Sequence, residues 1–450
     1  MRRTLLVIHS LILVSTCLLT RNVNAQQNLD GMIERDIASL VATYKTLHAA
    51  PELSHYEEKT SAFVAKELRA LGYTVTERIG TYQRPEWIGY GVAGVMKNGE
   101  GPVVLVRADM DGLPVEEKTG LPYASKVRAK TNANQEVGVM HACGHDIHVT
   151  ALLGTAKMLA QLKDQWRGTL VLIGQPAEET IDGARAMLDG GLYGKIPKPD
   201  FAIALHDNGG FEAGKVGVTP GFALANTTSV DITVRGVGGH GSAPENAKDP
   251  IVLAAQIIVA LQTIVSREIP PRDPAVVTVG SINGGTRYNI IPDEVKLQLT
   301  VRAYKEEVRQ QILASIERIA KGTALAAGIP AELTPVVKVS ETEVTPATYN
   351  DPAMTERLTR VFIKTLGREN VLDYPPIMGG EDFGRFGLEG QIPTVMFWVG
   401  AADPAKVAES KRTGKPLPSA HSAYFAPMPE PTIRTGVKAM TSAVMELMKR

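Results

Sequence analysis

The sequence predicts an α/β protein in which a mixed-sheet α/β domain is interrupted by a smaller α+β domain. The chain has 450 residues, which is long enough for two domains. Apolar, strand-like runs alternate with amphipathic helical patterns before residue 215 and again after residue 350. Between them the order of segments is strand, helix, two strands, helix and strand. We therefore expect residues 26–216 and 337–450 to form the larger domain and residues 217–336 the inserted one.

Residues 1–25 are expected to be a secretory signal that does not belong to the fold. Two arginines precede an apolar run over residues 5–19, and small residues ending at Ala25 form a cleavage site. The apolar run is short for a membrane span, so we expect no stable membrane anchor. The mature protein would then be secreted or periplasmic, and Cys143 would be its only cysteine.

Apolar periodicity and continuous apolar runs predict the elements that precede the insertion. A helical pattern covers residues 32–50, and Ser54 with Glu57 is expected to form a capping box for a second helix. Asp146 is the expected N-cap of a third helix, over residues 147–162. The strands expected here cover residues 73–78, 87–95, 103–107, 169–174 and 200–205.

The insertion is expected to contain one antiparallel sheet with two helices on one face. Its strands are expected over residues 229–236, 275–281, 294–302 and 331–339, and its helices over residues 250–267 and 305–326. The α/β pattern then resumes with a helix, a strand and a C-terminal helix, over residues 351–366, 394–399 and from 430 onward.

Composition argues against a nucleic-acid partner. The formal net charge is zero, so there is no general attraction to polyanions, and aromatic residues make up only 5% of the chain. With 44% hydrophobic residues, the chain is typical of a soluble globular protein.

A dense cluster of metal-binding side chains lies between residues 139 and 150. It holds three histidines, one cysteine and one aspartate within eight residues: His141, Cys143, His145, Asp146 and His148. The predicted strand ends add Asp109 and Asp111, Glu178 and Glu179, and His206. Because sites form beyond the carboxyl ends of strands in open α/β sheets, these groups together indicate a metal site.

A site in which two divalent cations share a water needs about five protein ligands and a carboxylate that moves the proton of that water. The ligands expected are Cys143, His145, Glu179, His206 and His421. Glu178, beside Glu179 on an irregular turn, is the expected general base and acid. Thiolate and imidazole suit zinc, whereas carboxylates also admit manganese, so the two cations are expected to be Zn²⁺ or Mn²⁺.

Other interpretations of these residues stay open at this point. The histidine cluster can be a helix cap with surface histidines, the glutamate pair a solvated turn, and His206 a core histidine. A binding protein without catalysis would have no need for Glu178 beside a ligand. A hydrolase that uses Cys143 as a nucleophile would survive removal of metal.

Six motifs, in order, resemble the aminoacylase/carboxypeptidase metallopeptidase superfamily. More narrowly, the chain is similar to its N-acyl-amino-acid amidohydrolase branch, which includes hippurate hydrolases and plant auxin-conjugate hydrolases. The motifs are His-Ala-Cys-Gly-His-Asp from residue 141, Gln-Pro-Ala-Glu-Glu from 175, Gly-Gly-His-Gly from 238, Asn-Ile-Ile-Pro-Asp-Glu from 289, Gly-Gly-Glu-Asp-Phe from 379 and His-Ser from 421.

The resemblance implies a two-metal catalytic domain with an inserted lid domain that usually dimerises. It gives Cys143 the position of the bridging ligand and Asp111 that of an aspartate that supports the ligands. The remaining ligand positions fall on His145, Glu179, His206 and His421, and Glu178 takes the position of the general base.

The resemblance also implies residues that bind the substrate. His240, Asn289 and Arg302 lie in the lid, where related enzymes bind the substrate carboxylate and the tetrahedral oxyanion, and His240 is expected to act across a homodimer. The expected activity is metal-dependent hydrolysis of N-acyl-amino acids or related small amides. The alternative is a dipeptidase or carboxypeptidase on the same scaffold.

Overall fold

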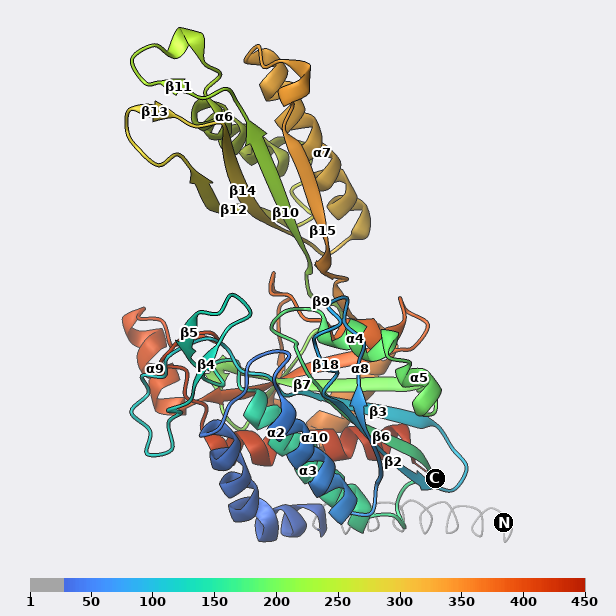
Figure 1. Cartoon of the computed structure of the whole chain (residues 1–450). Helices are drawn as coiled ribbons and strands as arrows, with labels where there is room; N and C mark the ends of the chain where they lie inside the picture. The colour runs from blue at the N-terminus through green and yellow to red at the C-terminus, as the bar shows by residue number, and fades with distance from the viewer. Residues whose placement is uncertain (1–27, 450) are drawn as a thin grey trace, which may run out of the picture.

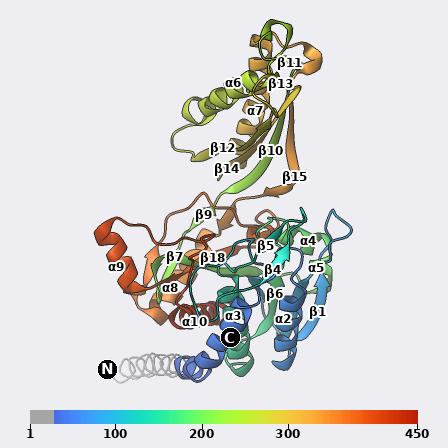
Figure 2. The same cartoon turned by 60° about the vertical axis from the view of Figure 1, so that its left-hand side comes forward.

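The computed structural model describes residues 28–449, which form a large lower unit and a smaller upper unit (Figure 1). Two segments of chain connect the units, and they lie side by side because β9 (Gly221–Leu224) pairs antiparallel with β16 (Thr348–Asn350). Figure 2 shows the same separation of the units after a turn of 60°. The signal predicted over residues 1–25 lies outside the described residues and stays a prediction.

A mixed sheet of eight strands forms the centre of the large unit. The strands are Thr74–Ile79 (β1), Gly91–Asn98 (β2), Val103–Asp109 (β3), Gly168–Gln175 (β6), Phe201–Glu212 (β7), Val216–Val218 (β8), Val371–Asp373 (β17) and Thr394–Ala402 (β18). Their order in the sheet is β1-β2-β6-β3-β7-β18-β8-β17. Strands β6, β3, β7 and β18 are parallel neighbours, whereas β1 and β2 pair antiparallel at one edge. The predicted strands before the insertion therefore all belong to one sheet.

Helices cover both faces of this sheet. A helix over residues 28–48 lies on one face, together with α2 (Glu58–Ala70), α3 (His145–Gln161), α8 (Pro352–Leu366) and α10 (Pro429–Leu447). The short helices α4 (Gly183–Asp189) and α5 (Leu192–Lys195) lie on the other. Alternate side chains of β3 enter the two cores: Val104 and Val106 one, Leu105 the other. Because both faces of β3 and β6 are buried, the sequences of these strands are continuous apolar runs.

The smaller unit holds a second, antiparallel sheet with the order β12-β14-β10-β15. Its strands are Asn226–Arg235 (β10), Ala275–Gly284 (β12), Glu294–Ala303 (β14) and Val336–Thr345 (β15). Helices α6 (Pro250–Thr263) and α7 (Glu306–Ala326) pack on one face and form a separate core with it. The predicted fold class, two units with mixed α/β and α+β character, is confirmed.

Several predicted boundaries differ from the structure. The second sheet extends from residue 226 to residue 345, and β8 belongs to the large sheet, so the inserted unit starts and ends later than residues 217 and 336. The predicted capping box is wrong, because neither side chain caps α2: Ser54 donates to Asp111, and Glu57 accepts from the backbone of Ala177. Both side chains bind the strand-end loops instead.

Asp146 is likewise not the N-cap of α3. The helix begins two residues earlier than predicted, at His145, and Gly144 with φ of 78° occupies the cap position. The Asp146 carboxylate instead accepts from Nδ1 of His48, 2.7 Å away, and Nε2 of His48 lies 3.2 Å from Glu117. A buried histidine therefore ties the N-terminal helix to the start of α3.

This contact gives the fold a predicted dependence on pH. Burial opposes the charge of His48, but hydrogen bonds with Asp146 and then Glu117 outweigh it and raise the pKa of His48 to about 10. The stabilisation is fully present below the ordinary histidine pKa of about 6.5 and is lost as the pH rises through the folded pKa. Replacing His48 with glutamine is expected to lower the free energy of unfolding by about 3 kcal/mol at pH 6.

Urea unfolding of the wild type and of His48→Gln, both with the same metal content, measures this effect. The difference between the two proteins should shrink as the pH rises from 6 toward 10. A difference that stays constant over this range would show that His48 is neutral in the folded protein.

Candidate metal centre

Three neighbouring parallel strands bring the predicted site residues together. In the order β6-β3-β7, β3 ends at Asp109 and leads to Asp111, β6 leads to Glu178 and Glu179, and β7 carries His206. One prediction needs correction: His206 does not end its strand. Strand β7 continues to residue 212 because it pairs with β18 along most of its length.

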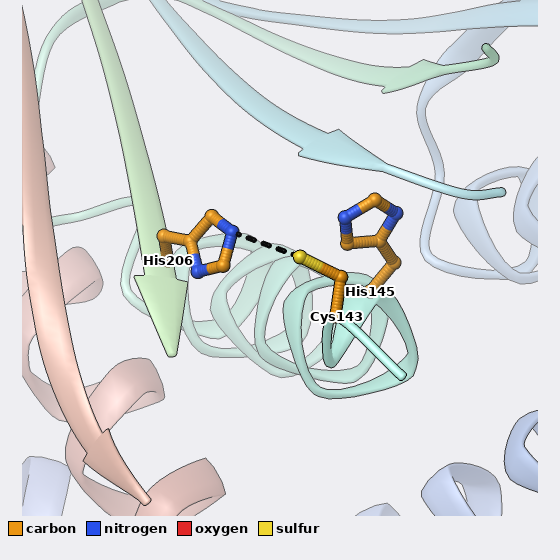
Figure 3. A group of neighbouring side chains, drawn as sticks. All are labelled: Cys143, His145 and His206. Carbon is orange, nitrogen blue, oxygen red and sulfur yellow. Dashed lines mark hydrogen bonds between the residues drawn. The ribbon is translucent and has the colours of Figure 1, made fainter. Parts of the chain in front are cut away.

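Cys143, His145 and His206 converge at the start of α3 (Figure 3). The Sγ atom of Cys143 lies 3.6 Å from Nε2 of His206. One ligand atom from each of the three side chains lies within 4.8 Å of the others. Gly144 makes the turn possible, because a Cβ at this position would lie 2.2 Å from a carboxylate oxygen of Asp207.

Glu179 and His421 form a second group of ligand atoms with Cys143, again within 4.8 Å of one another. Nε2 of His421 lies 3.4 Å from Oε2 of Glu179, and its backbone N–H donates to the carbonyl of Ala142. His421 thus comes from a distant loop that is fixed to the cysteine segment. Cys143 belongs to both groups, so its sulfur is the atom that two cations could share.

The ligand histidines are oriented by their second ring nitrogen. Nδ1 of His145 lies 3.2 Å from Oδ1 of Asp111, and Nδ1 of His206 donates to the carbonyl of Asp207 at 2.7 Å. Both rings therefore turn Nε2 toward the centre, as is usual for metal-bound imidazoles. Asp111 also accepts from the backbone N–H of Glu179, so one carboxylate positions two of the candidate ligands.

The residues present fit a pair of divalent cations. Nε2 of His145 and Oε1 of Glu179 are buried and have no hydrogen-bond partner among residues 28–449. Native proteins rarely leave such atoms unpaired, and a cation would satisfy both. One thiolate, three imidazoles and one carboxylate are ligand types suited to zinc, and the carboxylate also admits manganese.

His148, a further histidine near the centre, has both ring nitrogens hydrogen-bonded within the protein. His148 receives a hydrogen bond from the backbone N–H of Asp207 at Nε2, and its Nδ1 donates to Asp109. The structure shows that His148 holds together the segments that carry Asp109 and His206.

A buried arginine neutralises part of the acidic charge beneath the site. Arg107 donates to Asp109 at 2.6 Å, to Glu381 at 2.8 Å and to Asp382 at 3.3 Å, and all four side chains are buried. The Gly-Gly-Glu-Asp-Phe motif therefore supports the strand ends through Arg107, a role that the sequence did not indicate. Residues 274 positions apart make this contact, so no local pattern could reveal it.

Glu178 belongs to neither group around Cys143, although one of its oxygens lies within 4.8 Å of ligand atoms of His145 and Glu179. Its Oε2 is 3.8 Å from Nε2 of His145. Burial, reinforced by Glu381 and then Glu179, raises the pKa of Glu178 well above its usual range. A carboxyl group with a raised pKa can accept and release a proton near neutral pH.

Comparison with known proteins agrees with this geometry. Residues 105–446 match the family model described as peptidase family M20/M25/M40. This chain belongs to that family. The hippurate hydrolase of Campylobacter jejuni is 41% identical over 76% of this chain and 82% of its own length. Thermostable carboxypeptidase 1 of Saccharolobus solfataricus is 36% identical over 82% of this chain and 87% of its own length.

A solved structure within the M20 family is similar throughout. The Bacillus subtilis YxeP protein, described as a dinuclear metal-binding peptidase, has a TM-score of 0.70 and 28% identity, and the match covers 91% of this chain and 98% of that one. The predicted assignment to the amidohydrolase branch of this superfamily, and with it metal-dependent hydrolysis of amides, is confirmed.

In this M20 chain, two clefts adjoin the metal centre. One, of about 720 Å³, is lined by Cys143, His206 and His421, and by the aromatic side chains of Tyr374 and Trp398. The other, of about 650 Å³, is bordered by Glu179. Arg302 of β14 lines both clefts. Among the described residues no carboxylate forms a salt bridge with Arg302, and burial lowers its pKa.

The other two predicted lid residues do not reach the centre within one chain. His240 lies in β11 (Gly239–His240), and Asn289 precedes the strand that pairs with it, β13 (Ile290–Ile291). Both side chains are exposed, and Figure 1 shows β11 and β13 near the far end of the smaller unit. The structure thus brings together seven of the predicted catalytic-unit residues and leaves these two apart.

Proposed function

We propose that this M20 chain hydrolyses the amide bond of N-acyl-amino acids or closely related small amides at a centre of two divalent cations. The observation that carries the proposal is the position of Glu178. It lies beside five convergent ligand side chains and has a raised pKa, and a protein that only binds metal has no use for such a group. Two of the relatives named above, a hippurate hydrolase and a carboxypeptidase, support this substrate class.

Five residues would hold the cations: Cys143, His145, Glu179, His206 and His421. When bound, two divalent cations would lower the pKa of a shared water and polarise the amide carbonyl. The ligand set suits Zn²⁺ or Mn²⁺. Asp111 would keep His145 and Glu179 in place through its contacts with both.

Glu178 would move the proton. It accepts the proton of the attacking water and returns it to the nitrogen of the leaving amine, which a free carboxylate with an ordinary pKa would do poorly. Its position against His145 keeps the group next to the reacting atoms. Arg302, which lacks a carboxylate partner and lines both clefts, would bind the substrate carboxylate.

A second copy of the chain would supply His240 and Asn289. Helix α6 exposes an apolar face, with Ile251 at 42%, Val252 at 53% and Val259 at 72% of their surface accessible. Beside it, β12 is an edge strand of its sheet. An apolar face next to an open strand edge suits pairing with an identical unit. In a homodimer through the lid, the exposed His240 could stabilise the oxyanion in the partner's site.

Mixing two inactive variants tests this arrangement. Glu178→Gln and His240→Ala homodimers should each lack activity. Mixed dimers keep one intact site, so random reassociation should restore about a quarter of the wild-type activity. The amount of dimer, measured by light scattering, is the control. If His240→Ala alone stays active, or if verified mixed dimers stay inactive, His240 does not act across the dimer.

A dipeptidase or carboxypeptidase activity is the second candidate, and the similarity to a carboxypeptidase favours keeping it. The kcat/KM for matched N-acyl-amino acids and dipeptides separates the two activities. A cysteine nucleophile is disfavoured, because burial, then Glu179 and Glu178, raise the pKa of Cys143 well above its usual range. A nucleophilic thiol requires a lowered pKa.

A further inference from the structure

The cleft that Glu179 borders is lined by several arginine side chains. Arg84, Arg185 and Arg302 all line this cleft of about 650 Å³. Within residues 28–449, none of the three guanidinium groups has a carboxylate in salt-bridge range. Of the acidic side chains that line the same cleft, Asp182 is paired with His55, and Glu179 is a candidate metal ligand. The third, Glu343, is exposed and forms no salt bridge with the three arginines within the described residues. The outer part of the cleft therefore offers positive charge that the protein does not use.

Arg84 is held in place by an aromatic stack. Its guanidinium lies over the ring of Trp87, 4.8 Å from the centroid. The Trp87 ring stacks on His55, with centroids 3.6 Å apart and planes 15° apart, and Tyr82 packs edge-on against both. A guanidinium that stacks on an aromatic face keeps its N–H donors free at its edge, where a carboxylate can bind in bidentate fashion.

Arg185 approaches the same cleft from α4. One of its nitrogens donates to the carbonyl of Glu341 in β15, which fixes the side chain and leaves other N–H groups available. His55 adds an unpaired polar atom: its ring is buried, Nε2 contacts Asp182, and Nδ1 has no hydrogen-bond partner in the described chain. The amide side chains of Gln83 and Asn132 complete this part of the lining.

From these contacts we infer that Arg84 and Arg185 form a subsite for a second anionic group of the substrate, distinct from the carboxylate that Arg302 would bind. This inference rests on the proposed function. The preferred substrates are N-acyl-amino acids with an additional carboxylate, carried by the acyl group or by the amino-acid side chain. Trp87 is a positioning residue, since it acts through Arg84.

Two pairs of substrates test the subsite, and the members of each pair differ by one charge. The pairs also show which half of the substrate carries the charged group that the subsite binds. N-succinyl-L-alanine is compared with its succinamoyl analogue, and N-acetyl-L-glutamate with N-acetyl-L-glutamine. In each pair an amide replaces the second carboxylate and the α-carboxylate is kept. One acid should be preferred by about tenfold or more in kcat/KM, mostly through KM, since a charge-assisted hydrogen bond contributes enough for that factor. Which pair shows the preference tells which half of the substrate carries the charge.

Substitutions in the subsite test whether the two arginines cause this substrate preference. Arg84→Met and Arg185→Met should remove most of it and leave kcat/KM for the two amide analogues within about twofold of the wild-type value. Trp87→Phe should keep the preference, because the ring still supports Arg84, whereas Trp87→Ala should lose it. Arg360→Met, which removes an exposed guanidinium on α8, is the matched control.

Binding of the same four compounds to Glu178→Gln, measured by calorimetry, gives a result that does not depend on turnover. If Glu178→Gln binds one acid selectively but the wild type hydrolyses none of the four compounds, the proposed function is contradicted and the subsite is still supported. Equal kcat/KM and equal binding for acids and amides, with no effect of Arg84→Met, would overturn the subsite and leave amide hydrolysis intact.

Discussion

Replacing Glu178 with glutamine is expected to lower kcat by about 10³-fold, within the range typical of a lost general acid–base group. Glutamine keeps the shape of the side chain but cannot take up the proton of the attacking water. Because Glu178 lies outside the two ligand groups around Cys143, the variant should bind the same amount of metal as the wild type. Steady-state kinetics on an N-acyl-amino acid, with metal analysis of the same sample, measures both quantities.

The neighbouring glutamate provides the matched control for this prediction. Glu179→Gln should lose metal as well as activity, because Glu179 shares a ligand group with Cys143 and His421. Two adjacent carboxylates would then differ in function, one moving protons and one binding metal. If Glu178→Gln retains turnover near that of the wild type, Glu178 is not the general base.

Replacing Cys143 with alanine is expected to cost more than about 100-fold in activity and to reduce the bound metal. Cys143 is the side chain common to both ligand groups, so its loss affects both cations. Removing even the groups that only orient metal ligands costs about 10–100-fold in affinity or activity. Metal content after gel filtration and kcat/KM at fixed added metal are the measurements.

Cys143→Asp separates a ligand role from a chemical role of the thiol. Aspartate keeps a negative charge that can bind two cations. The aspartate variant should therefore recover metal and part of the activity relative to Cys143→Ala. An alanine variant with full metal and no turnover would instead indicate that the sulfur takes part in covalent chemistry.

The local elements of this fold were largely predictable, because apolar periodicity depends on near neighbours in the chain. Strands such as β3 and β6 are buried on both faces, so each reads as an apolar run. The ends of elements were less predictable. Ser54, Glu57 and Asp146 match capping patterns, yet tertiary partners bind their side chains: Asp111, the backbone of Ala177 and His48.

The same distinction applies to the site. Chemistry and order along the chain indicated Cys143, His145 and Glu179, because ligand side chains follow strand ends or precede a helix. The groups that support them depend on contacts between distant segments. Arg107 joins Glu381, and His148 joins Asp109 to the backbone of Asp207. The stack of Arg84, Trp87 and His55 belongs to this second kind, and no spacing rule would have found it.

The central claim is that this M20 chain cleaves amides with two bound cations held by the centre around Cys143. The most direct test is to remove metal with a chelator and then titrate Zn²⁺ or Mn²⁺ into the protein while hydrolysis of an N-acyl-amino acid is followed. We expect no activity in the metal-free protein and recovery that saturates near two equivalents per chain. Full activity in the presence of the chelator would contradict the claim.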